Sequence, residues 1–334
     1  MEKKLNTVDA ETLQSTPMEK TVFIVDGLIP QGVNVLSGAS KIGKSWLGLQ
    51  VARGRPVWGM TTLQCDVLYL SLEDTVRRIK DRLYQLTDDA PPNLHFAVAC
   101  GLIGSGLEEQ ITDFLTENPN TRLVIIDTLQ KVRDSKGGSG KSGVYGNDYD
   151  DIASIKRLAD QYSISILLVH HLRKMQDSSD PFNEVSGSTG ITGAADTNLI
   201  LKRKRSTNEA VLLANGRDVE YQELTLEFHN LVWELVKRKD SEEIHKAEIP
   251  GFLFRVADFM RSRNEWVGTA TNLLEQMQES EVTPNMVTKY LGQFAGEVLE
   301  PDGIRYKTKR TGQQRLIGFK KDDSNDADDG SIGI

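Results

Sequence analysis

Cysteine is scarce in this sequence, since only Cys65 and Cys100 occur among 334 residues. Two cysteines are too few for a disulfide framework or a cysteine-based zinc site, and so low a number is typical of a reducing compartment. No run of about 18 apolar residues is present, and the N-terminal segment lacks the apolar core of a signal peptide. We therefore expect a cytoplasmic protein that has no membrane partner.

An excess of positive charge is also missing. The net charge is −8 and the isoelectric point lies near 5.3, which argues against a protein that coats nucleic acid with its whole surface. The charge is unevenly distributed, however. Residues 305–321 hold seven basic residues and no acidic one, whereas residues 322–334 hold five aspartates and no basic residue. The sequence therefore predicts a local basic patch followed by an acidic tail.

Apolar stretches alternate with helical patterns over the first part of the chain. The composition, 38% hydrophobic and 26% charged, is that of a globular protein, and the length allows about two domains. Strands with almost no polar positions, separated by helices, indicate a parallel sheet covered on both faces. We expect such strands at residues 33–37, 66–71, 123–127 and 164–169. Further strands with short connections, at residues 199–204, 210–214, 224–228 and 232–236, indicate an antiparallel extension of that sheet.

The last third of the chain follows a different pattern. Residues 237–243 are strongly charged and are interpreted as a linker. Three helical patterns and then two short strands follow, at residues 252–263, 269–277, 285–294, 304–309 and 314–319. Three helices and a terminal hairpin predict a small α+β domain of the winged-helix type. Such a domain holds duplex DNA or serves as a protein–protein module.

Residues 38–45, GASKIGKS, match the phosphate-binding motif G-x-x-x-x-G-K-[ST] at every required position. Glycines let the backbone N–H groups turn toward phosphate oxygens, Lys44 reaches the β- and γ-phosphates, and the Ser45 hydroxyl is a ligand for Mg²⁺. The sequence therefore predicts ATP and Mg²⁺ as cofactors. The expected nucleotide-binding residues are Gly38, Ala39, Ser40, Lys41, Ile42, Gly43, Lys44, Ser45 and Trp46.

Two acidic residues follow predicted strands on the side where the phosphates would bind. Asp127 ends the apolar strand RLVIID and is expected to hold Mg²⁺ together with Ser45. No glutamate follows Asp127, so the base that activates water must come from another strand. Glu73 is our candidate, because it ends the strand LYLSLE and strand ends on this side converge on the nucleotide. Asp74 is expected to cap the next helix, and capping by both acids is the alternative.

Six stretches, in this order, make the sequence resemble the RecA-like hexameric replicative helicases, particularly the RepA type of plasmids and mobile elements. They are GASKIGKSWL, YLSLED, VIIDTLQ, LLVHHLRK, SGSTGITGAAD and LLANGRDVE. The resemblance implies an α/β fold, a RecA-like P-loop ATPase with a mainly parallel sheet. It also implies a base on the strand after the phosphate-binding helix, which is the place of Glu73. Finally, it implies a homo-oligomeric ring, with six subunits expected.

The resemblance assigns roles to further polar residues. His171 takes the position of the γ-phosphate sensor, and a structural histidine is the alternative. Arg217 takes the position of the arginine that a subunit supplies to its neighbour's nucleotide, although the lysine of the family's Lys-x-Arg is Asn215 here. Residues 202–205, KRKR, are a competing source of this arginine. Arg82 is expected to contact the nucleotide base.

Basic residues in two long loops and in the C-terminal domain are the expected DNA contacts. In RecA-like rings the loops that correspond to residues 134–143 and 173–190 line a channel for single-stranded DNA, and disordered surface loops are the alternative. The expected contacts to single strands are Lys136, Lys141, Arg173 and Lys174. The expected contacts to duplex DNA are Lys289, Arg305, Lys307, Lys309, Arg310 and Arg315.

These features together predict an ATP-hydrolysing DNA helicase or translocase of a replication system, with a primase or an initiator protein as a partner. The alternative is an ATP-switched DNA-binding regulator or loader that does not unwind DNA. A nucleotide kinase is disfavoured, because the chain shows no arginine-rich lid. The expected segments are an N-terminal arm (1–20), an ATPase domain (21–240), a linker (241–251), a winged-helix domain (252–321) and an acidic tail (322–334).

Overall fold

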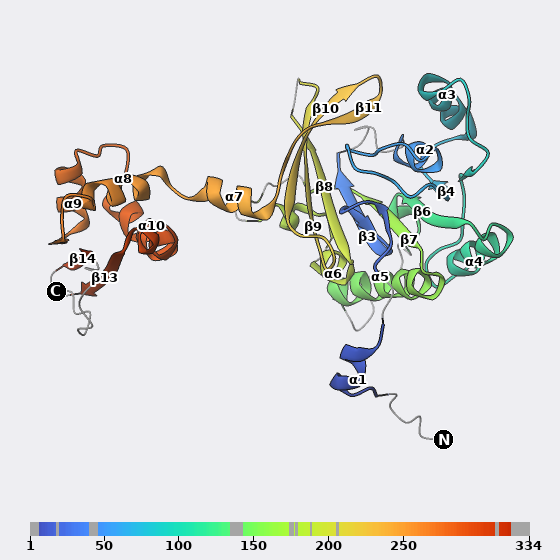
Figure 1. The fold of residues 1–334 in the computed structure, drawn as a ribbon. Coiled ribbons are helices and arrows are strands. Elements are labelled where there is room, and N and C mark those ends of the chain that lie inside the picture. The colour runs from blue at the N-terminus through green and yellow to red at the C-terminus, as the bar shows by residue number, and fades with distance from the viewer. Residues whose placement is uncertain are drawn as a thin grey trace. The chain divides into compact units, whose positions relative to one another are not determined.

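The structure is a computed structural model that describes residues 7–17, 20–39, 46–133, 143–173, 177, 180–187, 189–204, 207–310 and 314–321. The chain divides into two compact units, Met1–Ser241 and Glu242–Ile334, called unit 1 and unit 2 below. Figure 1 shows the fold of each unit as a ribbon.

A nine-stranded sheet forms the centre of unit 1 within the described residues, in the order β11-β10-β9-β8-β3-β7-β6-β4-β5. Neighbours from β8 to β5 in this order run parallel, whereas β9, β10 and β11 are antiparallel to their neighbours. The strands of the sheet are β3 (Gly32–Gly38), β4 (Asp66–Ser71), β5 (Leu94–Ala97), β6 (Thr121–Asp127), β7 (Ser165–His170), β8 (Thr197–Arg203), β9 (Glu209–Gly216), β10 (Gln222–His229) and β11 (Val232–Lys239).

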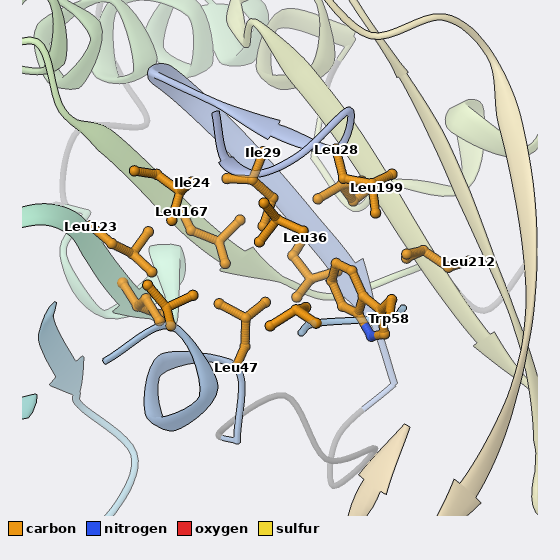
Figure 2. Packing of buried hydrophobic residues seen from close by; sticks show 14 of the residues in the cluster. Ile24, Leu28, Ile29, Leu36, Leu47, Trp58, Leu123, Leu167, Leu199 and Leu212 are labelled. Carbon is orange, nitrogen blue, oxygen red and sulfur yellow. The ribbon is translucent and has the colours of Figure 1, made fainter. Parts of the chain in front are cut away.

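Both faces of the parallel strands are covered, which explains their nearly continuous apolar sequences. On one face, Leu36, Leu123 and Leu167 share a buried cluster with Leu47 of α2 (Trp46–Ala52) and with Trp58 (Figure 2). A second cluster packs the opposite face against three other helices. The helices and the small hairpin of unit 1 are α1 (Ala10–Ser15), β1 (Phe23–Val25), β2 (Ile29–Pro30), α2 (Trp46–Ala52), α3 (Val76–Leu86), α4 (Leu107–Glu117), α5 (Gly143–Tyr162) and α6 (Thr189–Ala194).

The sheet confirms the predicted α/β fold class, a RecA-like arrangement with a mainly parallel sheet. One detail of the prediction was wrong, because β8, expected to belong to the antiparallel extension, runs parallel to β3. The reason is that α6 carries the chain back to the other end of the sheet before β8 begins, and such a crossover is what parallel neighbours require. The antiparallel part starts only at β9.

Two segments expected to be irregular contain regular structure. Residues 173–190 include the 3₁₀ turn η3 (Pro181–Glu184) and the start of α6, so the prediction of one long loop was partly wrong. The charged stretch 237–243, interpreted as a linker, contains the end of β11 at Lys239 and the start of α7 (Ser241–Glu248), and the boundary between the two units falls within it. In the described part of the chain, no helix combines the length and apolar character needed to cross a bilayer.

Unit 2 contains an antiparallel sheet in the order β12-β14-β13, packed against helices by one of its faces. Val287, Leu291 and Ala295 recur every four residues along one helix and are buried, as an amphipathic helix requires. Thr269 and Asn272 form a capping box that fixes the start of another helix. After α7, the elements are α8 (Gly251–Met260), β12 (Glu265–Gly268), α9 (Ala270–Met277), α10 (Pro284–Val298), the turn η4 (Glu300–Asp302), β13 (Ile304–Arg310) and β14 (Arg315–Lys321).

Candidate nucleotide and DNA sites

Four neighbouring parallel strands end at the same edge of the sheet in unit 1. The register pairs Leu36 of β3 with Val169 of β7, Val169 with Asp127 of β6, and Asp127 with Ser71 of β4. The residues that follow each strand are therefore brought to one edge. Because ligands of parallel α/β sheets bind at the carboxyl ends of the strands, this edge is the candidate nucleotide site.

The phosphate-binding motif begins at this edge. β3 ends at the buried Gly38, the next residue, Ala39, is exposed, and residues 40–45 lie outside the described part of the chain. The Trp46 side chain is only 2% exposed and packs edge-on against Trp58, with ring centroids 6.2 Å apart. The predicted nucleotide contact of Trp46 is therefore wrong for its indole ring, which belongs to the core, and only its backbone remains available.

Asp127 is held in place by a neighbour that the sequence analysis missed. The hydroxyl group of Tyr69 on β4 donates a hydrogen bond of 2.7 Å to Asp127 Oδ2. Tyr69 is 1% exposed, so the bond restricts the carboxylate to one orientation. The pattern YLSLED contains a signal for this contact, because Tyr69 and Asp127 lie on adjacent strands with side chains on the same face of the sheet.

Carboxylate and hydroxyl oxygens are suitable ligands for Mg²⁺, which keeps several waters and is usually bound through one or two carboxylates and nucleotide phosphates. Asp127 therefore fits the magnesium role expected for it. The described residues contain no group of three or more His, Cys, Asp or Glu that could hold a metal ion. The other ligands expected for Mg²⁺ are the nucleotide and Ser45, which lies outside the described residues.

Glu73 lies next to Asp127 in space although 54 positions separate them in the sequence. Its carboxylate Oε1 is 3.5 Å from the hydroxyl of Thr128, the residue that follows Asp127, a distance at the outer limit of a hydrogen bond. Glu73 is exposed, whereas Thr128 is buried. The structure therefore brings the two predicted acids to one place and leaves Glu73 accessible to water.

Asp74 does not cap the following helix, contrary to our expectation. The N-cap of α3 is Thr75, whose side chain accepts a hydrogen bond from the Arg78 backbone N–H. Asp74 instead forms a two-pronged ion pair with Arg82, with N–O distances of 2.5 and 3.1 Å. Arg82 is thereby fixed beside the site, and its contact with the nucleotide base remains a prediction.

The two adjacent histidines point to different environments. His170, the last residue of β7, is 3% exposed and its Nε2 lies 2.8 Å from the carbonyl oxygen of Ser186. Because a carbonyl only accepts, Nε2 carries the proton, and Nδ1 is a buried acceptor with no hydrogen-bond partner among the described residues. His171 is partly exposed and follows Val169 on the face that carries α2. This position suits the sensor role expected for His171.

The buried Asp148 of α5 contacts the residue before one of the two segments expected to line a DNA channel, and it lies close to a residue of the other. Arg133, just before residue 134, forms ion pairs with Asp148 and, at 2.7 Å, with Asp151 of α5. A Cβ at the position of Gly187, in the second segment, would lie 3.2 Å from Asp148 Oδ2. The Arg173 guanidinium also donates to the Gly187 carbonyl. Of the four cations expected to bind single strands, the structure describes only Arg173; Lys136, Lys141 and Lys174 lie outside its described residues.

Arg217 lies at the opposite end of the sheet from the nucleotide edge. It follows β9, whose Gly216 pairs with Thr197 at the start of β8. The backbone N–H of Arg217 donates to the Asp196 carbonyl at 2.8 Å, and its guanidinium lies 3.7 Å from the Asp196 carboxylate. Its side chain is 62% exposed. Arg217 is therefore far from the nucleotide edge of its own chain, and its action on a neighbouring subunit remains a prediction.

The competing basic stretch, residues 202–205, lies beside the nucleotide edge of its own subunit, since the register pairs Leu201 with Gly38. Lys202 forms an ion pair of 2.8 Å with the buried Glu184, and Lys204 forms one of 2.6 Å with Glu209. Its described cations are thus engaged in contacts within unit 1, and Arg205 lies outside the described residues. These contacts favour Arg217 over this stretch.

The residues expected to bind duplex DNA all lie in unit 2, on α10, β13 and β14. Lys289 is exposed on α10. The cations Arg305, Lys307 and Lys309 alternate along β13 and are exposed, while Arg310 pairs with Arg315 across the end of the hairpin. The structure thus separates one cation on a helix from a row of cations on a strand.

Burial lowers the pKa of His170 below its ordinary value of 6.5, and the hydrogen bond to Ser186 only partly opposes this effect. As the pH falls through about 6.5, the unfolded chain binds a proton that the folded chain does not, so the free energy of unfolding decreases. We expect His170→Gln to weaken this loss by up to about 1.4 kcal/mol per pH unit, measured by urea unfolding between pH 5 and 8. The exposed His229→Gln is the control, and equal pH profiles for wild type and His170→Gln would contradict the prediction.

This chain is similar to known proteins in part of its sequence and in its fold. The sequence profile of a family described as "AAA domain" matches residues 2–177, and no curated protein matches the sequence. Among solved structures, the chain is similar to a RadB recombinase, with 14% identity, a TM-score of 0.44, and coverage of 63% of this chain and 93% of that chain. It is also similar to a DnaB-like replicative helicase, described with its interactions with primase, with 15% identity and a TM-score of 0.49. That match covers 68% of this chain and 64% of the helicase chain, less than two thirds of the latter.

Because the profile match spans more than half of the 334 residues and includes the phosphate-binding motif and Asp127, the protein belongs to the AAA domain family.

Proposed function

We propose that the protein is an ATP-hydrolysing DNA helicase or translocase of a replication system, of mobile-element origin, that works as a hexameric ring on single-stranded DNA. The observation that carries the proposal is the convergence of the phosphate-binding motif, Asp127 and Glu73 at one edge of the sheet. A primase or an initiator protein is its proposed partner in replication.

The residues at this edge divide the work of hydrolysis between them. ATP would supply the phosphoanhydride that is cleaved, and Lys44 and Ser45 would bind its phosphates and Mg²⁺. Asp127, oriented by Tyr69, would hold the Mg²⁺ water shell. Glu73 is accessible and would accept a proton from the attacking water. This separation of roles requires two acids close together on different strands, which is the arrangement observed.

The position of Arg217 supports a ring in which each subunit completes the ATPase site of its neighbour. An arginine that reaches toward a neighbouring subunit's phosphates stabilises the charge of the transition state there. Since Arg217 lies at the far end of its own sheet and is 62% exposed, a complete site requires a second copy of the chain. Hydrolysis would then occur at subunit junctions, and the loops that begin at Arg133 and His171 would transmit its progress to bound DNA.

Unit 2 supports a contact with duplex DNA. Its order of elements, helix–strand–helix–helix–strand–strand from α8 to β14, supports assignment to the winged-helix type, a module that holds duplex DNA. Unit 1 would therefore bind the single strand and unit 2 the duplex.

A strand-displacement assay on a duplex with a single-stranded tail tests the proposal. Wild-type protein with Mg²⁺ and ATP is expected to separate the strands, and the triple variant Lys136→Gln, Lys141→Gln and Lys174→Gln is expected to lose this activity together with stimulation of its ATPase by single strands. Arg173 is left unchanged in this variant, because its contact with Gly187 belongs to the fold.

The matched control removes the same charge from exposed lysines elsewhere in unit 1, through Lys20→Gln, Lys80→Gln and Lys237→Gln. Its unwinding should equal that of the wild type. ATP-dependent DNA binding without strand separation in any of the proteins would instead support an ATP-switched regulator or loader. Absence of both binding and stimulation by single strands would rule out the helicase.

A further inference from the structure

The sheet of unit 2 has one apolar face and one strongly basic face. Ile304, Phe319 and Trp266 lie in the core, so the residues that alternate with them point to the other side. We call this side the outer sheet face; its cations are Arg305, Lys307, Lys309 and Lys320. The first three are exposed, and Lys320 is paired in register with Arg305 and with Glu265.

These cations form a regular row. Alternate residues of a strand are about 6.8 Å apart, so the three cations of β13 span about 13 Å, a length that corresponds to about four base pairs of duplex DNA. The neighbouring position on β14, opposite Lys307, is Gly318, which adds no side chain to the face. The row is therefore an extended cationic stripe along β13.

The exposed side of α10 is much less suited to a polyanion. It carries one cation, Lys289, and one anion, Glu297, so it contributes no net charge. Asn285 and Gln293 are also exposed on this helix, but their amide groups are neutral and supply no charge for phosphates. A contact that depends on phosphates is therefore expected at the sheet and not at α10.

We propose that unit 2 holds duplex DNA through the outer sheet face, by contacts with phosphates, and not through insertion of α10 into the major groove. The inference deepens the proposed function, on which it rests, by assigning the duplex contact to a surface and by making that contact independent of sequence. Phosphate contacts position a protein on DNA without reading bases. A helicase that advances through arbitrary sequence requires such a contact.

Binding of the full chain to two blunt duplexes of unrelated sequence, measured without ATP at 50 to 300 mM salt, tests the inference. The sheet variant is Arg305→Gln, Lys307→Gln and Lys309→Gln. Each lost phosphate contact lowers the slope of log K against log salt by about 0.9, so the slope should fall by about 2.7 and the affinity near 0.1 M salt by on the order of 10²-fold. The loss should be equal for both duplexes.

The matched control removes three exposed cations from other parts of unit 2, through Lys246→Gln, Arg255→Gln and Arg261→Gln. Binding by this variant should stay within about twofold of the wild type, since a uniform change in net charge alone contributes little at these salt concentrations. An equal or larger loss in the control, or a loss confined to one duplex, would overturn the assignment to the outer sheet face. Wild-type protein that binds neither duplex would show that the outer sheet face has another partner, such as an acidic protein.

Stimulation of the ATPase activity by single-stranded DNA should remain intact in the sheet variant and in its control. This measurement separates the inference from the proposed function. Intact duplex binding combined with no unwinding would refute the helicase and leave the outer sheet face assigned. Normal unwinding by the sheet variant, with its duplex affinity unchanged, would refute the inference alone.

Discussion

Replacement of Glu73 by glutamine is expected to lower the rate of ATP hydrolysis by about 10²- to 10⁴-fold, because a general base typically contributes that much to a proton transfer. Glutamine keeps the size and polarity of the side chain but cannot accept the proton of the attacking water. Nucleotide affinity should remain close to that of the wild type, since Glu73 is exposed and its contact with Thr128 is long, at 3.5 Å. Steady-state phosphate release and equilibrium binding of a fluorescent ATP analogue measure the two properties separately.

Two other variants make this result specific. Lys44→Ala should lose turnover and also bind nucleotide more weakly, because Lys44 is the expected phosphate ligand. Glu117→Gln, which removes an exposed carboxylate at the end of α4, should behave like the wild type. Hydrolysis at the wild-type rate by Glu73→Gln would show that the base is another residue. Loss of nucleotide affinity in that variant would assign Glu73 to binding.

Arg217→Ala is expected to reduce hydrolysis about 10³-fold or more while each subunit still binds ATP, since an arginine supplied in trans has an effect of that size. Arg217 lies at the far end of its own sheet, so the effect must act across a subunit junction. Mixing Arg217→Ala with Lys44→Ala protein should therefore restore part of the activity. At hybrid junctions one subunit contributes an intact phosphate-binding motif and its neighbour contributes the intact arginine.

The mixing experiment needs a control for the loss of an arginine in itself. Arg157→Ala removes an exposed arginine from α5 and should leave hydrolysis unchanged. Size-exclusion chromatography with light scattering should show that Arg217→Ala still assembles, which separates a catalytic loss from a loss of the ring. If no ratio of the two inactive proteins restores hydrolysis, Arg217 does not act in trans, and residues 202–205 become the next candidates.

The local sequence pattern was sufficient to predict much of the fold of unit 1. The strand 66–71 was predicted with the bounds that the structure shows, because a continuous apolar run is a property of a few consecutive residues. The same local logic placed Asp127 and Glu73 after strands, and the parallel character of the sheet then brought them to one edge. The short strands β5 and β12 were missed, since four residues carry too little pattern to be distinguished from a loop.

By itself, the sequence determined the phosphate-binding motif, the acids that follow the strands, the two-unit organisation and the concentration of basic charge near the C-terminus. Each of these features depends on residues that are close together in the sequence. Only the tertiary structure decided that β8 runs parallel to β3, that Arg217 lies far from its own nucleotide edge, and that Asp74 pairs with Arg82 instead of capping α3. It also separated the buried His170 from the accessible His171 and placed Asp148 beside both Arg133 and Gly187. These features depend on which strands become neighbours and on where a crossover returns the chain, and contacts between residues far apart in sequence leave no local pattern to read.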